Sequence, residues 1–337
     1  MPDNSFTIKT VDSSCAELVP VVFRAIYGDG FPVQYVYDGS LVLAEIASGH
    51  LSAAIALDQN NHAVGYVATY NNAPNQKLWE GGNLLVVPGC GFDDLGWHLL
   101  QYFLLPENLP VSGSDGSFTE SVCHHYFTQL GCAKLGFSDC ALMLDQMSAA
   151  SFKEHVPVTS RVACLMQFFE QSDPTAPCYL PERYFDFLQG LTCNLRPRTL
   201  LPGSAPLPTE GVTAYSDSWF SDAGMWRVSV SAIGNDWSTF LEMLLQKADQ
   251  RNVTSLQVVI SAALPFCDTA VELMRQHGFF LGGIFPRWFG SDGIMMQLIM
   301  GKQPDWEGIK LYSKTARELF GFIYQDYNDT LNGRKKS

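Results

Sequence analysis

The sequence has few charged residues, and most of them are acidic. Charged side chains make up 16% of the chain, and 34 acidic residues against 21 lysines and arginines give a net charge of -13. Nucleic-acid binding needs clustered lysine and arginine facing phosphates. The basic cluster Arg334-Lys335-Lys336 stands at the end of the sequence, where we expect a solvated tail. We therefore expect no nucleic-acid partner.

Long apolar runs and paired cysteine motifs are also absent. No uninterrupted apolar segment reaches the roughly 20 residues of a membrane-spanning helix. Residues 1–5 lack the basic start of a signal peptide. The nine cysteines form no C-x-x-C pair, which is typical of reduced, buried thiols. These absences predict a cytoplasmic protein that does not associate with membranes.

Several motifs that carry chemistry are missing as well. The sequence has no H-E-x-x-H, no cysteine–histidine ladder and no acidic triplet, so we expect no metal site. It also has no G-x-S-x-G elbow, which excludes the usual arrangement of a serine hydrolase.

Apolar residues are abundant and set the size of the fold. They make up 47% of 337 residues, enough for substantial cores, and the length favours two domains over one. We place an N-terminal domain at 1–150, a linker at 151–161, a C-terminal domain at 162–303, and a terminal helix and tail at 304–337.

The first half alternates helical and strand periodicities. We expect helices at 10–27, 40–48, 93–105 and 126–135, and strands at 51–57, 63–70, 77–87, 118–122 and 138–144. A polar segment at 58–62 joins two of these strands into a hairpin. A connection rich in proline, glycine and serine is expected at 106–116. This order predicts an α/β (α+β) fold with a mixed, mostly antiparallel sheet flanked by helices.

The second half repeats this order. We expect strands at 162–170, 211–216, 225–233, 255–261, 279–284 and 294–300, and helices opening at 177–184 and spanning 236–251, 270–277 and 310–327. His277-Gly278-Phe279 stands in the place that Leu135-Gly136-Phe137 occupies in the first half. The repetition predicts two tandem domains of one kind.

A strand, a glycine-bearing loop and a helix follow one another at 84–100. Pro88, Gly89 and Gly91 interrupt the apolar run, and Leu95 and Leu99 recur at helical spacing. Such a loop exposes the first backbone N–H groups of the helix, which favours an anion there. The same unit is also common as plain scaffolding.

These segments together resemble the GNAT acyltransferase superfamily. Val86-Val87-Pro88 matches the end of its fourth strand, and Leu95-Gly96 matches the end of its pyrophosphate loop, P-x-x-[RQ]-G-x-G-[IL]-[GA]. Leu135-Gly136-Phe137 is similar to the tripeptide that closes its last helix, and 58–67 to its hairpin. The resemblance spans roughly residues 6–147. It implies tandem GNAT-like domains that use acetyl-CoA or another acyl-CoA to acylate a small-molecule or peptide amine.

The resemblance assigns the acyl-CoA site to the fourth strand and the loop after it. The strand residues implied to hold the pantetheine arm are Leu85, Val86 and Val87, and the loop residues implied at the pyrophosphate are Gly91, Phe92, Asp93, Asp94, Leu95 and Gly96. The loop departs from the family pattern, because Gly91 stands at the basic or glutamine position and Phe92 and Asp94 replace glycines. Carboxylates there repel a pyrophosphate. Asp93 and Asp94 also suit a purely structural role as caps of the helix.

The resemblance also points to three candidate catalytic residues. Glu80 matches a position where many relatives hold the general base, although a charge at the strand edge is an equal alternative. Cys132 stands at the frequent catalytic tyrosine, where a buried structural thiol is the simpler interpretation. His125, beside His124, is a candidate for the wall of the acceptor pocket. The second half has Met274 at the tyrosine position and no glycine-rich loop, so we expect a scaffold or substrate wall.

Two functions remain open at this point. The first is an acyl-CoA-dependent N-acyltransferase with Glu80 as base and an amine in the cleft between the domains. The second is a catalytically inactive GNAT-fold protein that binds a ligand or regulates a partner. The intact strand and last helix favour the first, whereas the acidic loop and the missing tyrosine favour the second. The sequence leaves the oligomeric state open.

Overall fold

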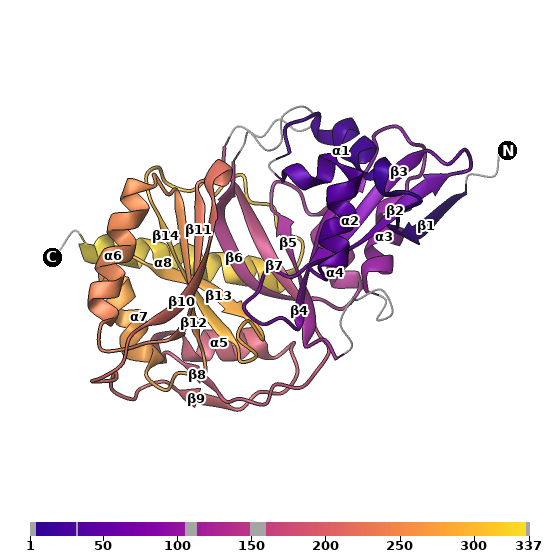
Figure 1. Cartoon of the computed structure of the whole chain (residues 1–337). Coiled ribbons are helices and arrows are strands. Elements are labelled where there is room, and N and C mark those ends of the chain that lie inside the picture. The colour runs from indigo at the N-terminus through magenta and orange to yellow at the C-terminus, as the bar shows by residue number, and fades with distance from the viewer. Residues whose placement is uncertain (1–4, 32, 105–112, 149–159, 335–337) are drawn as a thin grey trace.

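The computed structural model of the chain describes residues 5–31, 33–104, 113–148 and 160–334. Most of the predicted connection at 106–116 and of the linker at 151–161 falls outside these residues. Twelve strands form one sheet in the order β1-β2-β3-β4-β5-β7-β6-β13-β14-β12-β11-β10, and β8 and β9 form a small second sheet (Figure 1). Among the described helices, none combines the length and apolarity needed to cross a membrane.

The first half, coloured indigo to magenta in Figure 1, contains most of the predicted elements. They are β1 (Phe6–Thr10), α1 (Val19–Tyr27), α2 (Gly39–Ala47), β2 (Leu51–Asp58), β3 (Ala63–Tyr70), β4 (Leu78–Val86), α3 (Leu95–Leu104), β5 (Gly116–Val122), α4 (Phe127–Lys134), β6 (Ser138–Met147) and β7 (Val162–Glu170), with short 3-10 turns at Ala16–Leu18 and Gln34–Tyr37. The helix predicted from residue 10 begins only at Val19. The segment before it contains β1, which the prediction missed although Phe6 and Ile8 alternate with polar residues as strand residues do.

The second half continues with elements that follow the predicted order. They are β8 (Cys178–Leu180), α5 (Phe185–Thr192), β9 (Leu200–Pro202), β10 (Ala214–Phe220), β11 (Met225–Ala232), α6 (Trp237–Gln250), β12 (Ser255–Ser261), α7 (Cys267–Gln276), β13 (Phe280–Phe285), β14 (Gly293–Ile299) and α8 (Lys314–Arg334), with 3-10 turns at Glu182–Tyr184 and Ser221–Ala223. The prediction that a helix opens at 177–184 was wrong for its first residues, because Cys178 to Leu180 form a strand that pairs in parallel with Leu200 to Pro202.

Strand order and direction are the same in the two halves. The order β3-β4-β5-β7-β6 is matched by β10-β11-β12-β14-β13. In each set the second pair is parallel and the others are antiparallel. Helices α3 and α4 follow β4 and β5 in the chain, as α6 and α7 follow β11 and β12. The predicted mixed, mostly antiparallel α/β fold is confirmed, and the repeated topology supports a second domain of the same kind.

The strand β7 lies in the sheet of the first half, whereas the prediction put it at the start of the second domain. It pairs with β5 through Phe118 and Phe168, and with β6 through Leu142 and Leu165. The halves then join where Gly283 of β13 pairs with Ala141 of β6, so one sheet runs through both. The domain limits stay a prediction, and this pairing favours a boundary after Glu170.

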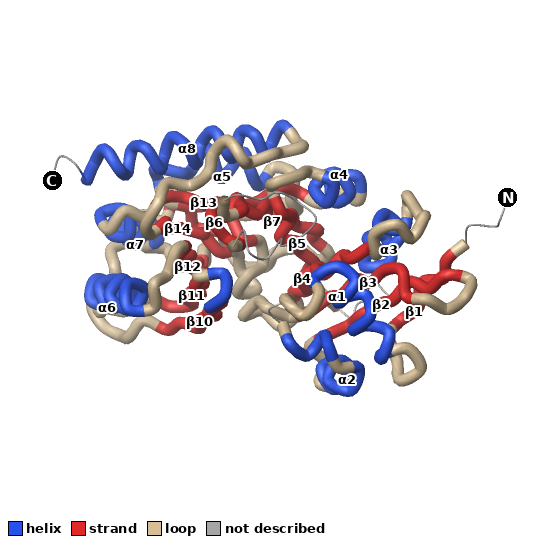
Figure 2. The backbone as a smooth tube through the Cα atoms, turned by 90° about the horizontal axis from the view of Figure 1, so that it is seen from above, coloured by secondary structure: helices blue, strands red, loops and turns tan. Residues whose placement is uncertain are grey.

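Helices cover both faces of the N-terminal strands. In Figure 2, α1 and α2 lie on one side of β2 and β3, and α3 lies on the other. The alternating side chains of β2 serve both layers, because Ile55 belongs to the core under α1 and α2 while Ala54 and Ala56 belong to the core under α3 and α4. The sheet also bends strongly, since β5 and β11 are not neighbours in it and yet form an ion pair through Glu120 and Arg227.

Candidate active site

The strands β4 and β5 pair briefly and then separate. Their parallel pairing runs from Leu78 opposite Gly116 to Gly81 opposite Thr119, and the described residues show no pairing beyond it. At this point β4 bulges: two residues, Asn83 and Leu84, lie between its pairings with Ala68 and Tyr66 of β3, and Asn83 has a left-handed φ of 52°. A bulge bends the strand that carries it. It therefore accounts for the opening between β4 and β5.

A cleft of about 1250 Å³ contains this opening and extends between the two halves. Residues 81–85 of β4 and 119–122 of β5 form one part of its wall. The loop after α1 adds Phe31 and Val33, and the second half adds residues 216–223, Arg227 and Trp288. The cleft is thus built by both halves, as the sequence analysis expects for an acceptor site.

Two carboxylates and a guanidinium meet in this cleft. Glu80 is only 7% exposed and accepts hydrogen bonds from the Tyr70 hydroxyl at 3.1 Å and the Asn72 side-chain amide at 2.8 Å. Glu120 lies two residues after Phe118, the strand partner of Glu80, so both carboxylates are on one face of the sheet. Arg227 Nη1 lies 2.7 Å from Glu120 Oε1.

The position of Glu80 changes its acidity. Burial is the main cause that raises the pKa of Glu80, the charge of Glu120 adds to it and Arg227 opposes both, and the net pKa is about 8. Burial also raises the pKa of Tyr70 well above its ordinary value. Near neutral pH Glu80 is therefore mostly protonated, and it exchanges its proton close to pH 8.

The structure brings His125 to the cleft together with His124. Both residues line it, and their rings are 4.3 Å apart. Burial lowers the pKa of both side chains, that of His124 to about 4. Both imidazoles are therefore neutral at pH 7, which suits a wall or a hydrogen-bonding role more than a charged one.

Cys132 does not line the cleft. It is buried in α4, with Sγ 3.5 Å from Oγ1 of Thr119, a cleft residue of β5. Burial raises the pKa of Cys132 to about 11, so it is a thiol at neutral pH. The buried structural thiol weighed in the sequence analysis agrees with this placement.

The predicted acyl-CoA residues divide into two groups. Leu85 lines the cleft, whereas Val86, Val87 and the loop residues Gly91, Phe92, Asp93, Asp94, Leu95 and Gly96 are not part of its lining. The loop side chains have other contacts: the Phe92 ring lies 5.3 Å from that of Phe6, and Leu95 is fully buried.

The two loop carboxylates lie in solvent at the start of α3. Asp93 and Asp94 are exposed, and Asp94 Oδ2 is 3.2 Å from Nε2 of His98. Gly91 has a φ of 81°, a conformation that suits glycine, so a larger basic residue there would be strained. The loop leads into the N-terminus of α3, where the helix dipole favours an anion, whereas the side chains of Asp93 and Asp94 oppose a phosphate.

Glu120 and Arg227 are not among the site residues predicted from the sequence. A short internal repeat is the signal that could have revealed Arg227. Leu78-Trp79-Glu80 pair with residues 116–118 of β5, and Met225-Trp226-Arg227 pair with residues 255–257 of β12. Glu80 and Arg227 are therefore counterparts in the two halves.

Among the described residues, the second half shows no opening that matches the one between β4 and β5. The parallel pairing of β11 with β12 continues from Met225 opposite Ser255 to Val230 opposite Ile260. A pantetheine arm would find no separated strands here in the described residues, which supports the expected scaffold or substrate wall.

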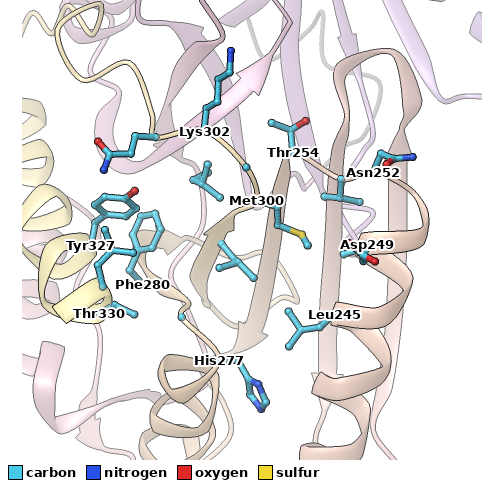
Figure 3. A pocket seen from close by; sticks show the side chains of 18 of the residues that line it. Leu245, Asp249, Asn252, Thr254, His277, Phe280, Met300, Lys302, Tyr327 and Thr330 are labelled. Carbon is cyan, nitrogen blue, oxygen red and sulfur yellow. The ribbon is translucent and has the colours of Figure 1, made fainter. Parts of the chain in front are cut away.

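A second cavity, of about 870 Å³, lies in the second half among α6, α7, β14 and α8 (Figure 3). Its apolar part includes Phe280, whose ring lies 5.1 Å from that of Tyr327. Figure 3 shows Lys302 and His277 at opposite ends, pointing away from each other. Ligand sites usually present a few convergent polar groups. The cleft with Glu80 meets that condition and this cavity does not.

Among known proteins, solved structures are similar to part of the chain. No protein-family model matches the chain, and no curated protein matches it. A GNAT superfamily phosphinothricin acetyltransferase from Sinorhizobium meliloti, solved with AcCoA, is similar to 51% of the chain over 92% of its own length, with 16% identity and a TM-score of 0.39. A GNAT family acetyltransferase from Brucella melitensis, solved with acetyl-CoA, is similar to 50% of the chain over 90% of its own, with 15% identity and a TM-score of 0.33.

A third solved structure is an acetyltransferase of the GNAT family from Staphylococcus aureus, which is similar to 50% of the chain over 100% of its own length, with 12% identity and a TM-score of 0.35. GNAT-family structures are thus similar to about half of the chain. Identities and TM-scores this low assign no activity, so the functional interpretation rests on the geometry of the cleft.

Proposed function

We propose that the chain is an acyl-CoA-dependent N-acyltransferase whose amine acceptor binds in the cleft between the two halves. The observation that carries this proposal is the opening between β4 and β5 beside the buried Glu80. A strand edge without a neighbouring strand can hydrogen-bond an extended ligand as it would an added strand. The amide groups of a pantetheine arm suit such an edge, and the family resemblance assigns them to the same strand.

Glu80 supplies the proton chemistry in this proposal. As a carboxylate it takes the proton of the acceptor ammonium, and a base is most effective when its pKa is close to the working pH. The free amine attacks the carbonyl carbon of the thioester, the N–C bond forms and the C–S bond breaks, with CoA leaving as a thiolate. The nitrogen is positively charged after the attack, and it loses its second proton through water to this thiolate, which gives the amide and the CoA thiol. Neither the Cys132 thiol nor an imidazolium is needed for this sequence.

The alternative is a GNAT-fold protein that binds a ligand without turnover. Two observations favour it: the exposed carboxylates of Asp93 and Asp94 at the start of α3, and the buried Cys132 at the tyrosine position. Both weaken parts of the site that lie away from Glu80, and neither closes the opening between the strands.

Calorimetric titration with acetyl-CoA tests the proposal. Val122 lies in the opening and is replaced by Trp to fill it, while Val21, an exposed residue of α1 outside the cleft, receives the same replacement as control. We expect the wild type and Val21→Trp to bind acetyl-CoA and Val122→Trp to bind at least tenfold more weakly. Mass spectrometry of an amine panel then detects acylated products.

Two outcomes would decide against it. Absence of binding at millimolar acetyl-CoA would overturn both the acyl-CoA site and the enzyme. Binding without acylation of any amine, unaffected by Glu80→Gln, would favour the ligand-binding alternative.

A further inference from the structure

Arg227 reaches the site of the first half from a strand of the second. Its side chain is buried, with Nη1 2.7 Å from Glu120 Oε1 and Nε donating to Gln257 Oε1 at 2.8 Å. The guanidinium also lies over the rings of Phe285 and Trp288, 5.4 and 5.6 Å from their centroids. These contacts come from several strands, so the position of Arg227 is fixed by the packing of the second half.

The titratable and charged groups around Glu80 come from four strands. Tyr70 of β3 donates to it, Glu120 of β5 shares its face of the sheet, and Arg227 of β11 pairs with Glu120. Cys164 of β7 also lines the cleft, and burial raises its pKa well above the ordinary value, so it stays neutral. Arg227 is the cation of this group.

Two buried carboxylates on one face do not ionise independently. The negative charge of the first raises the cost of ionising the second, and the pair then loses its protons in two separated steps. A nearby cation favours the charged form of a carboxyl group. Here the cation forms an ion pair with Glu120, whereas Glu80 has the neutral donors Tyr70 and Asn72.

We propose that Arg227 is a positioning residue of the cleft: its guanidinium pairs with Glu120 and thereby leaves Glu80, which has only neutral donors, as the carboxyl group that takes up and releases the proton. The inference rests on the proposed function only for the reaction that uses this proton. It gives the second half a part in the chemistry, beyond the scaffold or substrate wall expected from its sequence.

Infrared titration of the protonated carboxyl band tests the assignment without any substrate. Subtraction of the Glu80→Gln spectrum isolates Glu80, because Asp139 and Asp145, whose pKa burial also raises, contribute to both spectra. In the wild type we expect the band to disappear close to pH 8. Glu120→Gln removes the like charge beside Glu80, so the midpoint of the Glu80 band should fall by at least one pH unit in this variant.

Two replacements of Arg227 separate its charge from its packing. In Arg227→Met, the titration midpoint of the protonated carboxyl band should lie at least one pH unit above that of the wild type. In Arg227→Lys, which preserves the charge, the midpoint should stay within half a unit of the wild-type value. An unchanged midpoint in a folded Arg227→Met protein would overturn the proposal. If that variant does not fold, an unchanged midpoint in Glu120→Gln overturns it instead.

The outcome is distinguishable from that of the proposed function. If the midpoints shift as expected in the Arg227 and Glu120 variants and the protein binds no acetyl-CoA, the role of Arg227 is supported and the acyltransferase is rejected. Binding of acetyl-CoA and acylation of an amine, with midpoints that the variants do not shift, would support the acyltransferase and reject the role of Arg227.

Discussion

Glu80 depends on a glycine two residues further along the same strand. The hydroxyl group of Tyr70 lies against the backbone of Gly82, where any Cβ would overlap it. This close approach lets Tyr70 donate to Glu80 inside the cleft. Glu80 is thus a carboxyl group that is buried, hydrogen-bonded by neutral donors and close to a second carboxylate.

The same burial predicts how stability varies with pH. The folded protein holds the Glu80 proton up to about pH 8, above the ordinary carboxyl value of 4.5 that applies to the unfolded chain. Unfolding between these values releases the proton, so a rise in pH across this window lowers the free energy of unfolding. Glu80→Gln has no proton to lose and should lack this contribution.

Urea unfolding of the wild type and Glu80→Gln at pH 5, 6.5 and 8 measures the effect. The stability of the wild type relative to the variant should decrease steadily as the pH rises. Parallel curves for the two proteins would show that Glu80 titrates in the folded state as it does in the unfolded chain.

Only part of the group around Glu80 could be predicted from the sequence. Glu80 could be predicted because its place at the start of the fourth strand matches a position of the family that the sequence resembles. Arg227 could not, because its contact with Glu120 depends on how the sheet bends between β5 and β11. Cys132 was selected by its place before Gly136, yet position in a helix does not tell which face is buried.

At the scale of elements, the loop between β4 and α3 leads into a helix N-terminus and carries two exposed carboxylates. The dipole of α3 favours an anion at its N-terminus, whereas Asp93 and Asp94 oppose one. Such charges contribute roughly 0.3–1 kcal/mol each at low ionic strength. The loop therefore limits affinity for a pyrophosphate without excluding it.

Neutralising the two carboxylates should tighten acetyl-CoA binding. We expect Asp93→Asn with Asp94→Asn to lower the dissociation constant at low salt by about threefold to tenfold, with the gain reduced near 0.5 M salt by screening. Asp329→Asn with Glu307→Gln, which neutralises two exposed carboxylates of the second half, is the control for net charge. Calorimetry that finds equal affinities for the double variant and the control would place the pyrophosphate away from this loop.

The elements themselves were predicted best where a long apolar run or a clear periodicity marks them. The strands β7 and β12 have the predicted limits, and α3 begins two residues later than expected. The failures are the strands β1, β8 and β9. All three are short, so local periodicity carries little information about them.

At the scale of the whole molecule, the halves are joined through β6 and β13. The side chain of Gln297 strengthens this junction, because its Oε1 accepts from the Leu144 backbone N–H at 2.9 Å and its Nε2 donates to the Leu142 carbonyl at 3.0 Å. Composition and periodicity predicted two tandem units, but two units of this kind could also have been joined by a linker alone. The shared sheet follows from contacts that only the folded chain makes.

Gly283 is the residue on which this junction depends most directly. Its φ is 136°, which side-chain-bearing residues rarely adopt, and an added Cβ would overlap the backbone of Cys140 and Ala141. Both the strain and the overlap act at the pairing of β13 with β6. Gly283→Ala should therefore destabilise the protein by about 3 kcal/mol, from backbone strain and crowding of similar size.

Gly321→Ala is the matched control, because Gly321 lies exposed in α8 with open space around its Cβ position. It should stabilise the protein by roughly 0.5–1 kcal/mol, since alanine favours a helix. Urea unfolding of both variants measures the two effects. Because Arg227 reaches Glu120 across the two halves, Gly283→Ala should also shift the infrared midpoint of Glu80. A destabilised variant with the wild-type midpoint would mean that the cleft is held together by contacts other than this junction.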